Sequence, residues 1–132
     1  MLKKLTKAIA SAIEYLEASM KVASKGNDQE VSRPIWGAAA DLEYALFLFS
    51  ILQEESASSS WKLKSPSKDF EIHSFLTSAR DLLTEAKTEI EQEELDEAHK
   101  KTWMARGYLL KLHNFFEKKQ RKKKKAAKKS AG

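Results

Sequence analysis

Apolar residues recur every three or four positions in several long segments of the chain. In residues 2–24 they form one stripe, at Leu2, Leu5, Ile9, Leu16 and Met20. The same period marks residues 69–92 and 94–118, and in the latter it runs without a slip from Leu95 to Phe116. Such a period is typical of amphipathic helices, and an unbroken heptad seam is typical of an antiparallel bundle or coiled coil.

A further segment, between the first two stripes, is apolar on nearly every side. Ser32 and Pro34 suit a helix start, and the residues from Tyr44 to Leu52 are almost all apolar. Such a helix lies centrally in a bundle or meets a second chain, so we expect buried aromatic residues and self-association as a homodimer. The aromatic residues expected to be buried are Trp36, Phe47, Phe49, Trp103 and Phe116.

A serine-rich stretch between residues 54 and 69 interrupts the helical pattern and is long for a loop between helices. Within it, Trp61 either pins the loop to the helices or contacts a partner. The join at Glu91–Glu94 lacks Gly and Pro, so the last two helices could also form one bent rod. The predicted fold is an all-α, four-helix antiparallel bundle over residues 1–117, made of hairpins 1–54 and 69–117 with a Ser-rich linker at 55–68.

The two halves of the chain resemble each other weakly. A shift of 67 positions places Trp36 on Trp103, and it also aligns Leu42 with Leu109 and Phe49 with Phe116. These matches indicate an internal duplication, and chance similarity between Ala-, Leu- and Glu-rich helices is the alternative.

The composition excludes several classes of function. Hydrophobic residues make up 42% of the 132 positions, which is enough for a core. The absence of Cys excludes disulfide scaffolds, Cys-based zinc sites and thiol catalysis, and it favours a cytoplasmic location. No window reaches about 18 consecutive apolar residues, so we expect no membrane span. Scattered glycines and isolated histidines predict no phosphate loop, no metal site and no cofactor.

Positive charge is concentrated at the C-terminus. Of the 24 basic residues, nine lie in residues 118–132, which hold no acid; residues 1–117 carry the other 15 against 19 acidic residues. Such a run repels itself, so we expect this tail to be disordered. It neutralises phosphates without reading sequence, which favours RNA or DNA as its partner; a nuclear localisation signal, an anionic-lipid patch and simple solubility are alternatives. The predicted nucleic-acid-binding residues are Lys118, Lys119, Arg121, Lys122, Lys123, Lys124, Lys125, Lys128 and Lys129.

One edge of the fourth helix carries candidate chemistry. His99, Arg106 and His113 are seven residues apart and therefore share this edge. With six residues between them, Arg106 and His113 resemble the Arg-x(4–6)-His motif of the HEPN superfamily, whose members are small all-helical proteins, many of them metal-independent ribonucleases. The resemblance covers about residues 70–116, and Gly107 departs from it where a polar residue is usual.

The resemblance implies that Arg106 and His113 act at an RNA phosphate, usually across a dimer. The alternative is that both residues flank the seam as solvated or ion-paired side chains. Our leading hypothesis is a non-enzymatic helical module that binds RNA or DNA through its tail. The other two hypotheses are a HEPN-type ribonuclease, or its inactive relative, and an adaptor for a protein partner.

Overall fold

The computed structural model describes residues 1–23, 28–53, 61–63 and 71–131, with only the backbone for 28–29 and 120–131. In this part of the chain all regular structure is helical, which confirms the all-α prediction. Most of the predicted Ser-rich linker, residues 55–68, lies outside the described residues. The helices are α1 (Leu2–Ala23), α2 (Asp28–Gln53), α3 (Ile72–Glu91) and α4 (Leu95–Ala131).

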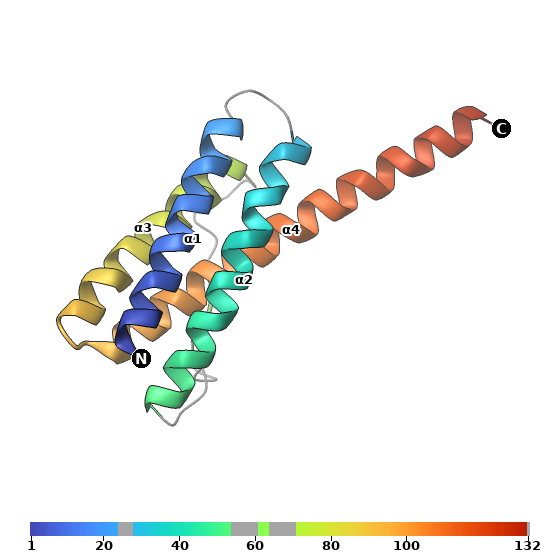
Figure 1. The fold of residues 1–132 in the computed structure, drawn as a ribbon. Coiled ribbons are helices and arrows are strands. Elements are labelled where there is room, and N and C mark those ends of the chain that lie inside the picture. The colour runs from blue at the N-terminus through green and yellow to red at the C-terminus, as the bar shows by residue number, and fades with distance from the viewer. Residues whose placement is uncertain (24–27, 54–60, 64–70, 132) are drawn as a thin grey trace.

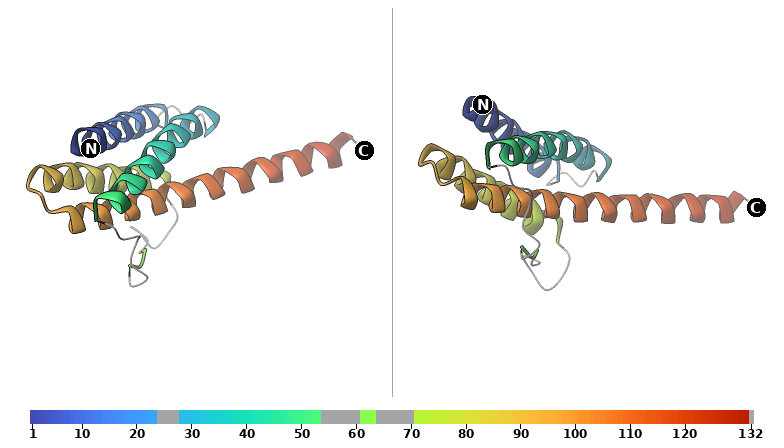
Figure 2. Two further views of the ribbon diagram at one scale, coloured as in Figure 1. Left: turned by 60° about the horizontal axis from the view of Figure 1, so that its bottom comes forward. Right: turned by 90° about the horizontal axis from the view of Figure 1, so that it is seen from below.

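The four helices form the predicted bundle of two hairpins. Figure 2 shows the α1–α2 hairpin lying over the α3–α4 hairpin, and the contacts between the layers are α1 on α3 and α2 on α4. Gln53 at the end of α2 bonds to Asp96 at the start of α4, whereas Trp36, nearer the start of α2, meets His113. The helices α2 and α4 are therefore antiparallel.

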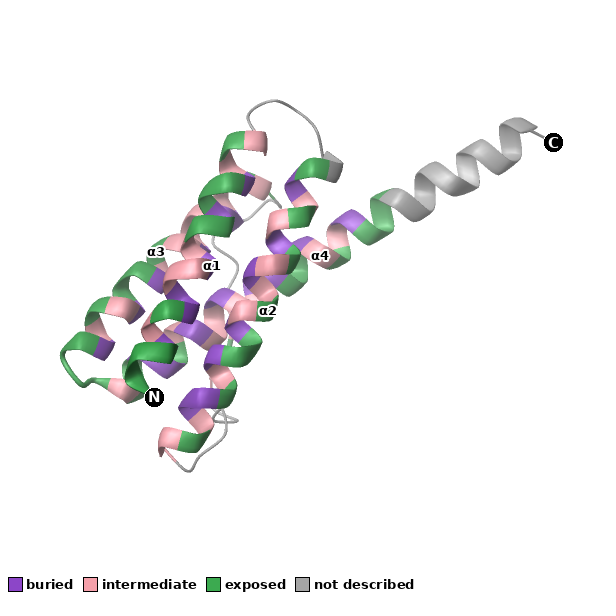
Figure 3. Cartoon of the chain, viewed as in Figure 1, coloured by how far each residue is buried: buried purple, intermediate pink, exposed green. Residues whose placement is uncertain are grey.

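The core consists of the stripes read from the sequence. Figure 3 shows the buried positions on the sides of the helices that face one another. The heptad seam of α4 is buried from Ala98 to Phe116, and Thr102 within it donates its hydroxyl hydrogen to the Ala98 carbonyl oxygen at 2.8 Å. The seam is thus an internal surface of this bundle.

Two of the five aromatic residues expected in the core are instead on the surface. Phe49 and Phe116 are buried as predicted and Trp103 is half-buried, but Trp36 is 58% exposed and Phe47 is 60% exposed. Both lie on the outer face of α2, because the core side of this helix is already formed by Val31, Ile35, Ala38, Leu42, Ala45 and Phe49.

The start of α2 also differs from the expectation. The helix begins at Asp28, so Pro34 lies inside it and not in its first turn. Val31 is fully packed in the core, and its carbonyl oxygen accepts a hydrogen bond of 3.1 Å from the Ser19 hydroxyl. Packing against α1 therefore holds the additional turn even though Pro34 cannot donate a backbone hydrogen bond.

By length and composition, residues Glu30–Gln53 of α2 would suffice to cross a membrane, and no other described helix passes this test. A core helix of a soluble bundle passes it as well, and 33% of the apolar window is buried inside this bundle. The expectation that the chain has no membrane span stays a prediction.

A sharp turn, and not a bent rod, separates α3 from α4. The amide of Glu93 donates to the Ile90 carbonyl at 3.0 Å, and the amide of Glu94 donates to the Glu89 carbonyl at 2.8 Å. This is the Schellman pattern, which places its C′ residue in the left-handed region, and Glu93 has φ of 61°. Gly is the usual residue there, and its absence hid the turn in the sequence.

The short described piece of the connection, residues 61–63, packs on α4. Trp61 meets the rings of His99 and Trp103 at centroid distances of 4.9 and 5.9 Å, which confirms that it pins the connection to the bundle. Leu63 lies so close to Gly107 that a Cβ on this glycine would come within 2.7 Å of it. A larger residue at position 107 would therefore displace the end of the Leu63 side chain.

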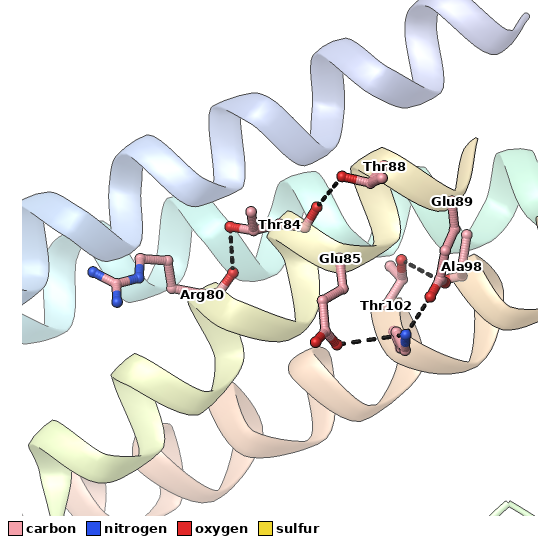
Figure 4. A network of polar contacts seen from close by, with 8 residues as sticks. Arg80, Thr84, Glu85, Thr88, Glu89, Ala98 and Thr102 are labelled. Carbon is pink, nitrogen blue, oxygen red and sulfur yellow. Dashed lines mark hydrogen bonds and ion pairs between the residues drawn. The ribbon is translucent and has the colours of Figure 1, made fainter. Parts of the chain in front are cut away.

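Polar contacts join α3 to α4 beside the core. Lys101 forms ion pairs with Glu89 and, at 3.4 Å, with Glu85 (Figure 4). The hydrogen bond to Glu89 outweighs the desolvation of the ammonium group and raises the pKa of Lys101 above its ordinary value. The ammonium group of Lys101 thus stays charged throughout the neutral range.

The 67-residue shift holds for most of the buried positions. Under this shift Asp28, where α2 begins, corresponds to Leu95, where α4 begins. The buried residues Ala8, Ile9, Ala12, Leu16 and Ser19 of α1 correspond to Phe75, Leu76, Ala79, Leu83 and Ala86 of α3, all of which are buried. The two hairpins are thus built on one pattern, while their origin by duplication stays a hypothesis.

Beyond the bundle, the backbone of α4 continues as a helix to Ala131 and projects away from the other three helices (Figure 1). The sequence led us to expect a disordered tail for residues 118–132. Lys, Arg and Ala are strong helix formers, and the segment continues a helix that packing has already nucleated. We call residues 118–131 the basic extension.

The buried seam predicts a large effect of Leu109→Ala, because Leu109 is fully buried. We expect a loss of about 2–5 kcal/mol in the free energy of unfolding, measured by urea denaturation. The matched control is Leu110→Ala at a position that is 40% exposed, which we expect to change stability by less than about 0.5 kcal/mol. A loss below about 1 kcal/mol for Leu109→Ala would contradict the internal position of the seam.

The turn at Glu93 predicts a stabilising substitution. Glu93→Gly should raise the free energy of unfolding by about 0.5–1 kcal/mol, because relief of the left-handed strain exceeds the entropy that Gly adds to the unfolded chain. Glu93→Ala removes the same charge but keeps the Cβ, so it should not stabilise. Equal gains from both variants would assign the effect to charge and not to the backbone.

Candidate nucleic-acid interface

The antiparallel crossing of α2 and α4 positions the polar residues along one edge of α4. Glu43 of α2 pairs with Arg106, and Trp36, seven residues earlier, meets His113, seven residues later. Equal steps on both helices keep the contacts in register along the crossing. This edge leads directly to the basic extension.

Arg106 lies at the surface of the crossing, and its side chain is 31% exposed. Its Nε donates a hydrogen bond to the Glu43 carboxylate, which also neutralises the charge of the guanidinium group. In this structure Arg106 therefore joins α2 to α4.

His113 is the next residue along the same edge. Its ring meets the Trp36 ring edge-on, with 4.2 Å between the centroids, and its Nε2 lies 3.4 Å from a carboxylate oxygen of Glu117. Arg106 and His113 each have an acidic partner of their own. A separation of seven residues corresponds to about 10 Å along the helix axis.

His99 shares the edge in sequence but is buried in the structure. Its ring stacks on Phe49 at 4.9 Å between centroids, and its Nδ1 lies 2.6 Å from the side-chain oxygen of Gln53. The Gln53 amide group donates in turn to Asp96. Because the oxygen of Gln53 can only accept, Nδ1 of His99 is the donor, and this histidine has a structural role.

The basic extension begins directly after the core ends. Phe116 is the last buried residue described in α4, and Lys118 and Lys119 are exposed. The ammonium group of Lys119 lies 6.0 Å from the centroid of the Phe115 ring. The remaining predicted binding residues, Arg121, Lys122, Lys123, Lys124, Lys125, Lys128 and Lys129, follow on the helical backbone of the extension.

A second apolar stripe of α2, which was not predicted as a separate surface, faces away from the core. Trp36, Tyr44, Phe47 and Ile51 are all exposed on the side of α2 away from the core. Their spacing with Ala40 is three or four residues, so the stripe was visible in the sequence. It could not be told apart from the core stripe of α2, because both stripes lie in the same run of apolar residues.

Other features of the described surface do not involve this edge. An open groove of about 460 Å³ between α1 and α3 is lined in part by Lys3, Lys7 and Lys87, and neither Arg106 nor His113 reaches it. Among the residues whose positions are described, no three His, Asp or Glu side chains are grouped so as to hold a metal ion. The candidate interface is therefore the edge of α4 together with its basic extension.

Comparison of the chain with protein-family models, with curated proteins and with solved structures finds no match.

Proposed function

We propose that this protein is a non-enzymatic helical module that binds RNA or DNA without sequence specificity through the basic extension of α4. The observation that supports this most directly is the position of nine basic residues and no acid on a segment that leaves the bundle. Lys and Arg in such numbers neutralise phosphates and release condensed counterions, which gives affinity without base readout.

The bundle supports this role by anchoring the extension. Leu109, Leu112 and Phe116 fix the preceding turns of α4 in the core. The bundle itself, with 15 basic and 19 acidic residues up to position 117, is not attractive to a polyanion. Phosphate contacts are therefore expected on the extension and not on the surface of the bundle.

Deleting residues 118–132 should abolish most nucleic-acid binding. It should leave the melting temperature nearly unchanged, because this segment contains no apolar residue larger than Ala. For the full chain, nine cations in contact with phosphates give a slope of log K against log salt of up to about −6 to −8. Fluorescence anisotropy with labelled RNA and DNA across a salt series measures both quantities.

A truncated protein that binds as tightly as the full chain at about 50 mM salt would contradict the proposal, since the extension would not be the binding element. A flat salt dependence of the full chain would exclude phosphate contacts as the source of affinity. Circular dichroism of the truncated protein is the control for folding.

The alternative of a metal-independent ribonuclease depends on Arg106 and His113. A histidine has the ordinary pKa that proton transfer near neutral pH needs, and a fixed arginine can hold a phosphate. Here Arg106 is engaged by Glu43, and His113 lies beside Glu117. We therefore propose that the pair is structural, and the enzymatic role would require its partners to be displaced, as in a dimer.

Incubation of the protein with single-stranded RNA in EDTA separates these alternatives. We expect wild type and His113→Ala to leave the RNA intact on a denaturing gel, and both to bind it. Cleavage by wild type that is lost in His113→Ala, with binding retained, would instead favour the ribonuclease. Arg106→Gln is the companion variant, because it removes the charge that would hold the phosphate.

A further inference from the structure

We propose that Trp36 is a stacking site for an unpaired base, so that the protein prefers single-stranded nucleic acid to a duplex. This inference rests on the proposed function, because the basic extension supplies the phosphate contacts beside the site. It adds a class of ligand, single strands, and a residue outside the charged segment.

The ring of Trp36 is available to a ligand. The side chain is 58% exposed and is held from one side by the edge-on contact with His113 at 4.2 Å. A large aromatic residue that is fixed by a neighbour and open to solvent loses little freedom when a base stacks on it. Base–aromatic stacking of this kind is tolerant of sequence, as the proposed function requires.

The position of Trp36 places it where the basic extension begins. Its neighbour His113 is five residues before Lys118, which is about 7.5 Å along the helix axis. Arg33 is exposed one turn before Trp36 on the same face of α2. Two acidic residues are also nearby. Glu117 lies 3.4 Å from His113 on α4, and Glu30 is exposed on α2.

Position along the helix distinguishes Trp36 from the other strongly exposed aromatic residue of α2. Phe47 is 60% exposed, much like Trp36. However, it lies one turn after Glu43 and eleven residues after Trp36, which is about 16 Å farther along α2 from the start of the extension. A phosphate chain bound to the extension would therefore pass Trp36 and not Phe47.

The basic extension and Trp36 together favour single strands because the extension contacts phosphates, whereas Trp36 needs an unpaired base. Phosphates are exposed in a duplex and in a single strand alike, so the extension binds both and does not by itself favour single strands. A base that is paired inside a helix cannot stack on a protein ring, whereas an unpaired base can. Trp36 thus adds affinity for single strands only.

The test compares full-length variants by fluorescence anisotropy, using an unstructured single-stranded RNA and the duplex formed from the same sequence. We expect Trp36→Ala to weaken single-strand binding about 5- to 100-fold and Trp36→Phe to retain most of it. Duplex binding and the salt slope should change little. Phe47→Ala is the matched control, with similar exposure, and should bind both ligands like wild type.

A further variant keeps failure of this inference separate from failure of the proposed function. A variant with Gln in place of Lys122, Lys123, Lys124 and Lys125 loses four charges but keeps helix propensity. It should lower the affinity for both the single strand and the duplex. If this variant does so and Trp36→Ala has no effect, the extension binds and the stacking site is wrong. If neither variant weakens binding, the proposed function itself fails.

Self-association through the second apolar stripe of α2 is the competing use of Trp36. Sedimentation equilibrium of wild type and Trp36→Ala, with melting curves as a control for folding, decides it. A wild-type dimer that Trp36→Ala converts to a monomer would assign the residue to contact between copies and would overturn the stacking site. An unchanged mass together with selective loss of single-strand binding would support it.

Discussion

The burial of the α4 seam, from Ala98 to Phe116, is the interaction on which the rest of the structure depends. Isolated helices are costly to nucleate, but a packed helix propagates into a following segment of good helix formers at little further cost. The core therefore explains why α4 continues past its last buried residue, and it holds the start of the basic extension in one place. Without that packing, the same nine charges would be carried on a chain of no fixed direction.

The same packing determines what lies beside the extension. Because α2 crosses α4 in an antiparallel register, equal steps of seven residues place Glu43 on Arg106 and Trp36 on His113. Glu43 and Glu117 contact Arg106 and His113, the pair that resembles a ribonuclease motif. The exposed Trp36 lies near the start of the basic extension. The crossing is therefore consistent with the proposed binding role, in which the bundle orients the extension and Trp36 adds one aromatic contact.

Periodicity alone predicted the helices and most of the core, because a stripe such as Leu5, Ile9 and Leu16 has few other ways to be buried. It could not tell which of the two apolar stripes of α2 faces inward, so Phe49 was placed correctly and Phe47 was not. Local rules failed where packing overrides them, at Pro34 inside α2 and at the left-handed Glu93. For the candidate site, spacing showed that Arg106 and His113 share an edge, but their partners come from α2 and from the next turn of α4, and no sequence rule supplies those.

The most direct test of the central claim, that nucleic acid binds along the basic extension and passes Trp36, is a heteronuclear NMR titration of the labelled protein with single-stranded RNA. The chain has three tryptophans, so their indole N–H signals report separately on Trp36, Trp61 and Trp103. The account predicts shifts in the backbone amides of residues 113–131 and in the indole of Trp36, with the other two indoles unchanged. Shifts confined to α1 and α3, with the extension and Trp36 unaffected, would contradict it.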